Sequence, residues 1–259
     1  MSKANYAMQI FSIWNDIAAY RGPSFATSRH SHFFAQICLA SEKPLRLRGR
    51  NGVWKEYRVA YIPSGISHET ERTEFPFTII LMDPLTIGAR IFQDLILPTG
   101  EPAIDVSDYP GMEEFGRINE ALVQPNRETR WKVLQMLDPF MLSVSQATID
   151  ERIRSSIEYV SSSDDQISLT DVAKRSGLSA GRFRHLFREQ TGIAYSGYRL
   201  WIKTRKAILF LAERPDLISA ALEGGFSDQA HFSRIFRRSF GMAPSELRKN
   251  DLFRIQIFT

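Results

Sequence analysis

A short pattern that occurs twice in the last third of the sequence constrains the fold more than any other feature. In each copy, three apolar residues stand at positions i, i+3 and i+4, and a glycine follows five residues later. The matched residues, 49 positions apart, are Phe183, Leu186, Phe187 and Gly192 in the first copy and Phe232, Ile235, Phe236 and Gly241 in the second. Such a triad forms one buried face of a helix, and a glycine just beyond it commonly ends the helix in the left-handed conformation. The repeat predicts two similar short helices.

Signals for a second helix and a tight turn precede each of these helices. In the first copy, Ser168-x-x-Asp171 forms a capping box, Gly177 ends the first helix, and Ser179 is placed to cap the next. In the second copy, a helix over residues 217–223 is followed by a Gly-Gly-Phe turn, and Ser227 or Asp228 is the expected cap. This arrangement is typical of a helix-turn-helix. A helix from about residue 196 to 211, ~24 Å long, separates the two units.

The outward faces of the two helices carry residue types that read DNA. Arginine can bind guanine with two hydrogen bonds, glutamine can pair with adenine, and histidine can donate to a base acceptor. The expected base-contacting residues are Ala180, Gly181, Arg184 and His185 in the first unit and Gln229, Ala230, Ser233 and Arg234 in the second. Phosphate contacts, which position the protein without specifying sequence, are expected from Arg182, Arg188, Arg237 and Arg238.

The charge distribution agrees with a polyanionic partner for this part of the chain. Residues 151–249 hold 17 lysines and arginines against 11 acidic residues, whereas the rest of the chain holds 16 against 18. The basic excess therefore lies where the helices are predicted. The single cysteine, Cys38, cannot form an internal disulfide. No signal-peptide pattern and no apolar run of ~18 residues is present, so we expect a cytoplasmic protein without a membrane partner.

The sequence pattern of the N-terminal part is typical of a small β-barrel or β-sandwich followed by helices. Residues 5–14 and 32–87 contain short apolar or alternating runs separated by turn sequences, which predicts strands. Residues 112–123 and 128–144 show helical periodicity. The second of these helices carries one apolar stripe, formed by Trp131, Leu134, Leu137, Phe140, Met141 and Val144. The stripe must be covered either by the barrel or by the same helix of a second subunit.

Residues 150–249 resemble the DNA-binding domain of the AraC/XylS family of bacterial transcription regulators. The resemblance is carried by the run Gly225-Phe226-Ser227-Asp228-x-x-x-Phe232-Ser233-Arg234-x-Phe236-Arg237-Arg238-x-Phe240-Gly241-x-x-Pro244-x-x-x-Arg248. It implies two recognition helices in successive major-groove turns of one DNA face, with base contacts at the positions named above, and RNA polymerase as a partner of an activator. Gly181 and His185 depart from the family pattern, so the first unit is expected to read fewer bases. Ala220 and Gly224 replace larger residues, which predicts a loosely packed second unit.

His30-Ser31-His32 and Pro63-Ser64-Gly65-Ile66-Ser67-His68 resemble the two motifs with which cupin barrels gather a metal. Gln36 stands at the position of the acidic ligand, and three imidazoles with one amide could hold Zn²⁺, Ni²⁺ or Fe²⁺. Regulators of this family commonly keep such a barrel as a sensor without metal. We therefore expect no metal and no other cofactor, and we assign His30, His32, Gln36 and His68 to the binding of a small-molecule effector. A barrel that serves only as a dimerisation scaffold is the alternative.

The sequence therefore predicts an α+β protein with two domains, made of a cupin-like β-barrel with a helical extension and an all-α domain with two helix-turn-helix units. The expected segments are a sensor barrel (1–100), a dimerisation or docking segment (101–149), a DNA-binding domain (150–249) and a tail (250–259). The expected function is a homodimeric, sequence-specific transcription regulator that responds to an effector and has no catalytic residues. A metal-dependent cupin oxygenase or isomerase with an appended DNA-binding domain is the alternative, and an architectural DNA binder is a third possibility.

Overall fold

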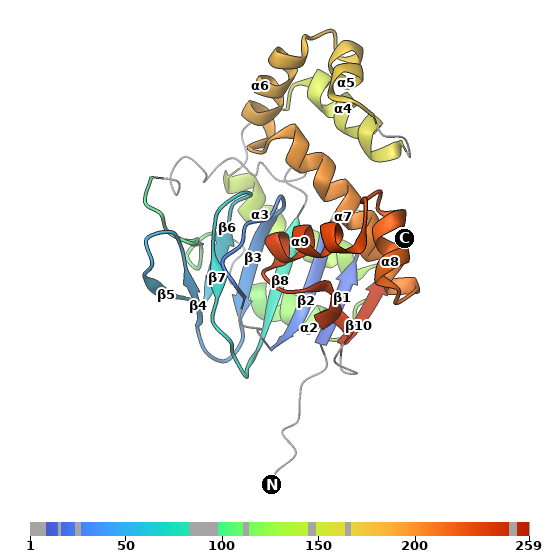
Figure 1. Cartoon of the computed structure of the whole chain (residues 1–259). Coiled ribbons are helices and arrows are strands. Elements are labelled where there is room, and N and C mark those ends of the chain that lie inside the picture. Colours follow the sequence, from blue (N-terminus) through green and yellow to red (C-terminus); the bar gives the residue numbers. More distant parts are fainter. Residues whose placement is uncertain are drawn as a thin grey trace.

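The computed structural model describes residues 9–14, 17–23, 27–82, 98–110, 114–144, 149–163, 167–248 and 253–258 (Figure 1). Among these residues, the N-terminal half forms two β-sheets covered by helices α2 (Phe115–Ala121) and α3 (Thr129–Val144), and the C-terminal half is mostly helical. The mixed α+β architecture predicted from the sequence is confirmed. Residues 5–8 and 83–87 of the expected strand segments lie outside the described residues.

The strands form a large sheet and a small one. The large sheet has the order β10-β1-β2-β8-β3-β6-β9, and the small sheet has the order β5-β4-β7. Their bounds are β1 (Gln9–Ile13), β2 (Ile17–Pro23), β3 (Ala35–Ala40), β4 (Leu45–Arg48), β5 (Trp54–Tyr57), β6 (Val59–Ile62), β7 (Glu69–Thr70), β8 (Pro76–Met82), β9 (Ile104–Asp105) and β10 (Phe253–Ile257). Strand β10 runs parallel to β1, and the other pairs are antiparallel.

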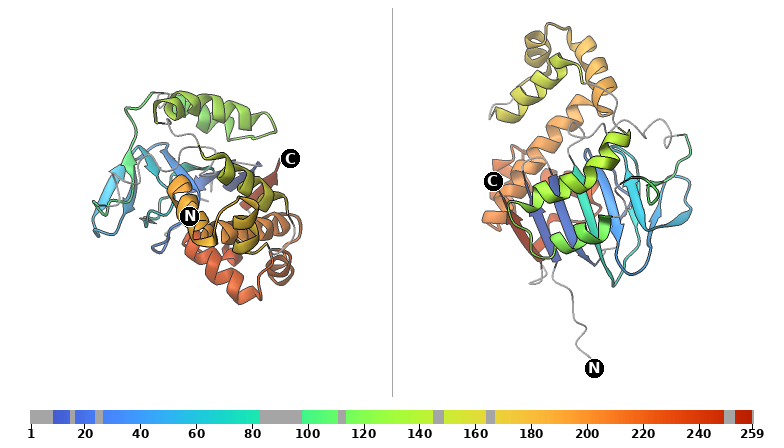
Figure 2. Two further views of the ribbon diagram at one scale, coloured as in Figure 1. Left: turned by 90° about the horizontal axis from the view of Figure 1, so that it is seen from above. Right: turned by 180° about the vertical axis from the view of Figure 1, so that it is seen from behind.

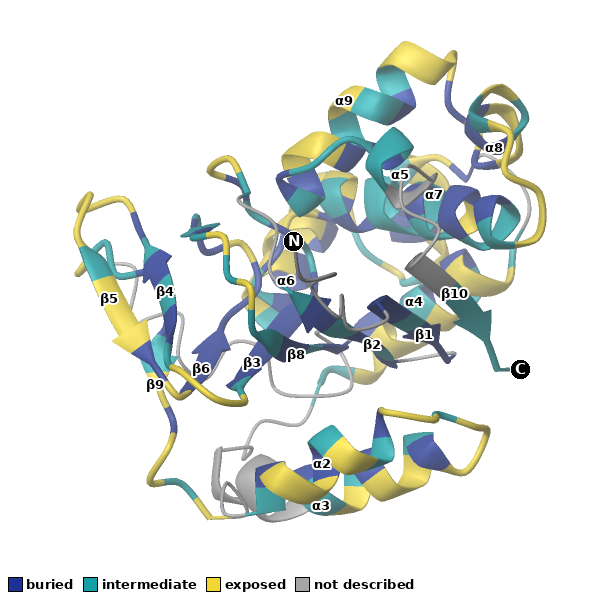
Figure 3. Cartoon of the chain, turned by 90° about the horizontal axis from the view of Figure 1, so that it is seen from below, coloured by how far each residue is buried: buried dark blue, intermediate teal, exposed yellow. Residues whose placement is uncertain are grey.

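The large sheet separates two hydrophobic cores because side chains alternate between its faces. On β3, Ile37 and Leu39 face one core, whereas Cys38 faces the other. The first face is covered by α2 (Phe115–Ala121) and α3 (Thr129–Val144), which lie across the back of the sheet (Figure 2). The opposite face is covered at one end by the small sheet and at the other by the C-terminal helices, as Figure 3 shows from below.

The C-terminal half contains the two predicted helix-turn-helix units joined by a long helix. Its helices are α4 (Glu151–Ser162), α5 (Leu169–Arg175), α6 (Ala180–Thr191), α7 (Tyr195–Glu213), α8 (Leu217–Glu223), α9 (Gln229–Phe240) and the 3-10 helix η2 (Pro244–Arg248). The expected caps are confirmed, since Ser168, Ser179 and Asp228 each accept a hydrogen bond from a backbone N–H of the first turn. Gly192 and Gly241 end α6 and α9 in the left-handed conformation, with φ of 75° and 69°.

The large sheet takes in two segments that lie outside the expected sensor barrel at 1–100. Strand β9 pairs with β6, and β10, from the expected tail, extends the sheet beyond β1. Strand β2 was not predicted, because its sequence Ile-Ala-Ala-Tyr-Arg-Gly-Pro is poor in β-branched residues. The chain therefore crosses back to its own N-terminal sheet after the DNA-binding domain.

The second helix-turn-helix unit shares its core with the large sheet. Ile13 of β1 belongs to the same buried cluster as Phe232 and Phe236 of α9, and Ile255 of β10 packs against it. The expectation of loose packing in this unit is wrong. A Cβ at Gly224 would lie 2.7 Å from the carbonyl oxygen of Lys203 and 2.9 Å from the Cβ of Ala207, so glycine permits the close approach of α8 to α7.

The apolar stripe of α3 is divided between the sheet and solvent. Val133 and Leu137 are buried in the core beneath the sheet, and Leu134 packs against it. Trp131, by contrast, is 63% exposed. The side chains of Phe140, Met141 and Val144 lie outside the described residues. The sheet therefore covers the centre of the stripe but not Trp131, whose ring lies under the guanidinium group of Arg130 at 4.5 Å.

Candidate DNA-reading helices and interdomain cavity

Helix α6 presents the first set of predicted DNA contacts to solvent. Phe183 and Phe187 are fully buried in the core of the first unit, which fixes the rotation of the helix about its axis. Gly181, Arg184 and His185 are consequently exposed, and Ala180 is half-buried. The arginines expected at phosphates, Arg182 and Arg188, are also exposed. The predicted face therefore exists as one contiguous outer surface of α6.

Helix α9 repeats this arrangement in the second unit. The buried triad member Phe232 turns Gln229, Ala230 and Arg234 to solvent, with Ser233 half-buried. Arg237 and Arg238 are exposed in the last turn of the helix. The structure thus places all the predicted DNA-contacting side chains on the outer faces of α6 and α9, where they can reach a groove or a phosphate backbone.

The two units differ in how they are attached to the rest of the molecule. Helices α4 to α6 project away from the sheets, whereas α8 and α9 lie beside the large sheet (Figure 1). Phe34, at the start of β3, packs against Trp201 of α7 and Phe240 of α9, with ring centroids 5.1 and 5.6 Å apart. The second recognition helix is therefore docked on the N-terminal half.

A cavity of about 110 Å³ lies at this junction. The N-terminal half supplies one wall, with aromatic and aliphatic side chains such as Phe77, Ile79 and Leu81. The C-terminal half supplies the other wall. It is formed by Ile208 of α7, by the side of α9 that faces the sheet, and by Met242 just after α9. The inward residues are Phe236, Ser239, Phe240 and Met242. The lining is mostly apolar, with polar groups gathered at the predicted histidines.

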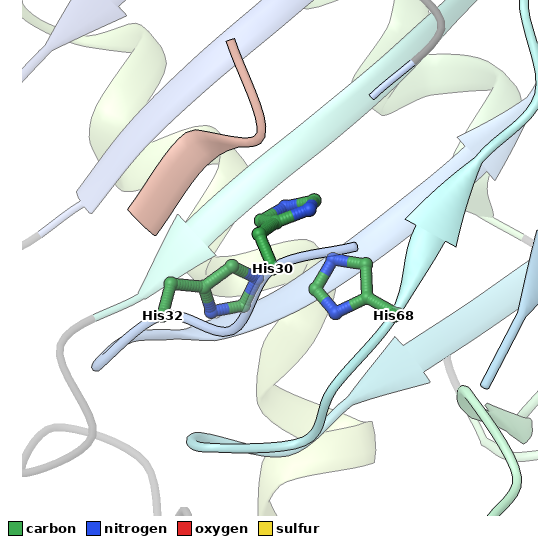
Figure 4. Close-up of side chains that lie close together, drawn as sticks. All are labelled: His30, His32 and His68. Atoms are coloured by element: carbon green, nitrogen blue, oxygen red, sulfur yellow. The ribbon is translucent and has the colours of Figure 1, made fainter. Parts of the chain in front are cut away.

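The structure brings His30, His32 and His68, which all line the cavity, close together (Figure 4). One potential ligand nitrogen from each ring lies within 4.8 Å of the others. His30 and His68 also pair through two backbone hydrogen bonds of 2.9 Å. Gln36, the fourth predicted residue, lines the same cavity, and its Nε2 donates to the sulfur of Cys38 at 2.8 Å.

The hydrogen bonds of the three rings determine which nitrogen is free. Each Nδ1 faces a backbone carbonyl oxygen: that of Ser28 for His30 (3.0 Å), of Phe34 for His32 (2.7 Å) and of Ile66 for His68 (3.0 Å). Because a carbonyl only accepts, Nδ1 carries the proton and Nε2 carries the lone pair. The Nε2 atoms of His32 and His68 are buried without a hydrogen-bond partner.

Burial keeps these imidazoles neutral. It lowers the pKa of His30 to about 4 and that of His32, which also lies beside His30, to about 3. The pKa of His68 lies well below its usual range for the same reasons. Neutral imidazole with Nδ1–H bound to a carbonyl is the form that ligates metals through Nε2. The three side chains therefore fit a divalent transition-metal ion.

Sequence reasoning missed the residues of α9 and the following turn that close the cavity. Phe236 was assigned to a helical core, which it does enter, and Ser239, Phe240 and Met242 were given no site role. No local signal identifies them, because their contact with the sheet depends on how the second unit docks. The nearest local signal is Gly241, whose left-handed conformation marks the point after α9 where the chain changes direction.

Comparison with known proteins supports the assignment of helix-turn-helix units to the C-terminal half. A family model described as a helix-turn-helix domain matches residues 172–250. The arabinose operon regulatory protein of Escherichia coli is 31% identical over 144 residues, covering 52% of this chain and 49% of that protein. The Transposon Tn10 TetD protein of Escherichia coli is 30% identical over 94 residues, covering 36% of this chain and 68% of that protein.

The chain belongs to the AraC family of transcription regulators. It spans about half the length of the arabinose regulators that it matches. This AraC family member also resembles solved structures over nearly its whole length. ToxT from Vibrio cholerae O395 superimposes with a TM-score of 0.58 at 14% identity, covering 89% of this chain and 95% of that one.

A form of Vibrio cholerae ToxT with bound unsaturated fatty acid superimposes with a TM-score of 0.55 at 14% identity, covering 89% of this chain and 93% of that one. These similarities show that the sheet-rich half and the helical half together have the fold of ToxT. Among the described residues of this AraC family member, none of the helices has the length and apolar character needed to cross a membrane.

Proposed function

We propose that this protein is a sequence-specific, DNA-binding transcription regulator whose affinity for DNA depends on a small molecule bound between its two halves. Family membership supports DNA binding, as do the two exposed faces on α6 and α9. The observation that carries the regulatory part is the position of the cavity, because one helix forms both a cavity wall and a DNA-reading face.

The cavity favours a predominantly apolar effector. Its lining is rich in phenylalanine and branched aliphatic side chains, and burial of apolar surface provides the main driving force for binding. Its volume of about 110 Å³ is well below the ~300–1,000 Å³ of typical ligand pockets. A ligand of ordinary size must therefore move α9 relative to the sheet. Such a ligand would bind the conformation with a displaced α9 more tightly than the one with α9 docked, and a difference in affinity of this kind is what shifts a conformational equilibrium.

Selection of binding sites from a random pool of duplexes tests the DNA-binding function. The protein is expected to enrich one site, and Arg234→Ala is expected to weaken binding to that site by ~1–3 kcal/mol. The loss should be much smaller on random duplex, because Arg234 is assigned to a base. Equal affinity of the native protein for selected and random DNA would instead favour an architectural DNA binder.

A homodimer formed through α3 is part of the proposal. Trp131 is 63% exposed while its neighbours Val133 and Leu137 are buried, so an apolar ring is left on the outer side of the helix. Large exposed aromatic side chains are enriched where proteins associate. Sedimentation of the native protein and of Trp131→Ala, over the same concentration range, would show whether this residue contributes to a dimer.

The protein is further proposed to act as an activator that contacts RNA polymerase in the bacterial cytoplasm. A relative from Yersinia enterocolitica, 33% identical over 84 residues that span 31% of this chain and 30% of that protein, is named a virulence regulon transcriptional activator. Transcription from a promoter that carries the selected site, measured with purified polymerase, tests this role. A fall in transcript on adding the protein would indicate repression.

We propose that the protein has no enzymatic activity of its own. The hydroxyl of Ser64 donates to the carbonyl oxygen of Phe33 at 2.8 Å, and Nδ1 of His68 faces the carbonyl of Ile66. The serine and histidine of the 63–68 turn therefore have other partners and are not arranged as a nucleophile and its base. The alternative of a cupin oxygenase would require turnover of a substrate with a bound metal.

A further inference from the structure

The three-histidine cluster is built on two backbone segments that are already locked together. Thr27 N–H donates to the carbonyl of Thr70 at 3.2 Å, and Gly65 N–H donates to the carbonyl of His32 at 2.8 Å. Together with the His30–His68 pair, these bonds hold the segment 27–32 against the segment 65–70 along its whole length. The imidazoles are thus fixed in relation to one another by backbone, which is the preorganisation that a metal site needs.

We propose that His30, His32 and His68 bind one divalent transition-metal ion through their Nε2 atoms, and that this ion couples the cavity to the recognition helix α9. The part that concerns α9 rests on the proposed DNA-binding function, whereas binding of the ion does not.

The orphaned Nε2 atoms argue for a metal rather than for an ordinary buried cluster. A buried polar atom without a partner destabilises a protein, and this site holds two of them, on His32 and His68, whose ring centroids are 4.9 Å apart. One ring nitrogen of each histidine lies within 4.8 Å of the others. A tetrahedral ion with metal–nitrogen bonds of ~2.1 Å holds its nitrogen ligands ~3.4 Å apart, so binding of the ion draws the three imidazoles closer together.

The nature of the ligands narrows the choice of ion. Three imidazoles favour Zn²⁺, Ni²⁺, Fe²⁺ or Co²⁺ over Mg²⁺ or Ca²⁺, which prefer oxygen ligands. Three protein ligands also leave at least one coordination position facing the cavity, where an oxygen or nitrogen atom of the effector can bind. Binding of an ion here would differ from the metal-free barrel that the family resemblance implies.

The segment that carries His30 and His32 is also the contact point for α9. Ser28 donates to the carbonyl of Gly241 through its backbone N–H (3.2 Å) and through its hydroxyl (3.1 Å). Ser31 N–H donates to the carbonyl of Arg238 at 3.4 Å. An ion that draws the three imidazoles together therefore acts on a segment bonded directly to the C-terminal end of the second recognition helix.

Metal counting on the full chain tests the binding site. The native protein, stripped by chelator and dialysed against Zn²⁺ or Co²⁺, is expected to retain one ion per chain. His32→Gln and His68→Gln are expected to lose it while keeping the native far-ultraviolet circular dichroism. The double variant His185→Gln/His231→Gln removes the other two histidines of the sequence and should retain the ion. This control variant is used only to count bound metal ions and not to measure DNA binding, because His185 lies on the proposed DNA-reading face of α6.

A DNA titration with and without Zn²⁺ tests the coupling. Coupling free energies between sites usually change affinity by about 5- to 150-fold, so we expect at least a 5-fold change in Kd for the selected site. His68→Gln should respond less than 2-fold. A folded native protein that retains no ion, or variants that retain it, would overturn the site. Bound ion with an unchanged Kd would overturn the coupling. Absence of site-specific DNA binding under all conditions would contradict the proposed function. The number of ions bound per chain would still test the metal site.

Discussion

Replacement of Gly241 by alanine tests how the end of α9 is held against the N-terminal half. Gly241 has a φ of +69°, and a Cβ at this position would lie 2.6 Å from the Cβ of Thr27, 2.8 Å from the carbonyl oxygen of Ser28 and 2.9 Å from Nδ1 of His30. Two separate effects should therefore destabilise the variant. One is the left-handed backbone conformation, and the other is the collision with the segment that carries the histidines.

Gly177 provides a control that isolates the first effect. It has a φ of +67°, and a Cβ there would have no neighbour within 4 Å. Alanine in the left-handed region costs ~1–2 kcal/mol, so Gly177→Ala should lose about that much. Overpacking adds ~1–3 kcal/mol, so Gly241→Ala should lose ~2–5 kcal/mol in total. The difference between the variants reports on the docking of α9.

Thermal and urea unfolding of both variants would measure this difference. For a chain of this size, ~1 kcal/mol shifts Tm by ~2–4 °C, so Gly241→Ala should melt several degrees below Gly177→Ala. Binding of both variants to the selected DNA site provides a second measurement. Displacement of α9 in Gly241→Ala should alter the contacts of the second unit with DNA, whereas a distorted turn in Gly177→Ala should alter only those of the first unit. Equal losses of stability would refute the contact between Gly241 and the segment 27–32.

Three further predictions address phosphate binding, the sheet and α3. Arg237→Ala should weaken binding to all DNA alike and reduce the slope of log K against log salt by about 0.9, as expected for one lost phosphate contact; an unchanged slope would remove it from that set. Truncation after residue 250 removes β10 and the following Phe258, whose ring stacks on Trp14 with centroids 5.2 Å apart. Loss of these partly buried apolar groups should cost ~2–4 kcal/mol in urea unfolding. Leu137→Ala, at a fully buried position, should cost ~2–5 kcal/mol, whereas Trp131→Ala should change stability by less than ~0.5 kcal/mol and weaken only self-association.

The helical half was predictable because its signals are local. Ser168 and Ser179 cap helices through hydrogen bonds to residues three positions away, and glycines at 192 and 241 end them through their own φ angles. None of these interactions depends on distant parts of the chain. The bounds of α8 and the cap of α9 consequently follow from the sequence to within a residue or two, although α7 extends a little further at each end than its periodicity indicated.

The extent of the sheet was less predictable because its pairing is non-local. Strand β10 lies more than 200 residues from its partner β1, and β2 is made of residues with weak strand preference that are held between β1 and β8. Such strands exist because their neighbours provide hydrogen-bond partners. Neither periodicity nor turn sequences can reveal a partner so distant in the chain.

The candidate site shows the same division. The resemblance of the segments around His30, His32 and His68 to two cupin motifs implied that these side chains converge, and the structure places them within one cluster. The closing wall was not predictable, because Phe236 and Phe240 read from sequence as members of a helical core. That they also face a cavity follows from docking of the whole second unit, which is decided by surfaces far apart in the chain.

The unequal attachment of the two helix-turn-helix units has a consequence for regulation. A helix is only ~10–12 Å across, so the DNA-reading side of α9 and its cavity side are separated by one helix diameter. The first unit has no such position. Among the described N-terminal side chains, Phe33 packs against its core, and α6 does not line the cavity. A ligand or ion in the cavity can therefore reorient α9 relative to α6 only about α7. Regulation through this cavity should change contacts at the half-site proposed for Gln229 and Arg234 while leaving the half-site proposed for Arg184 occupied, and footprinting of both half-sites would separate these two effects.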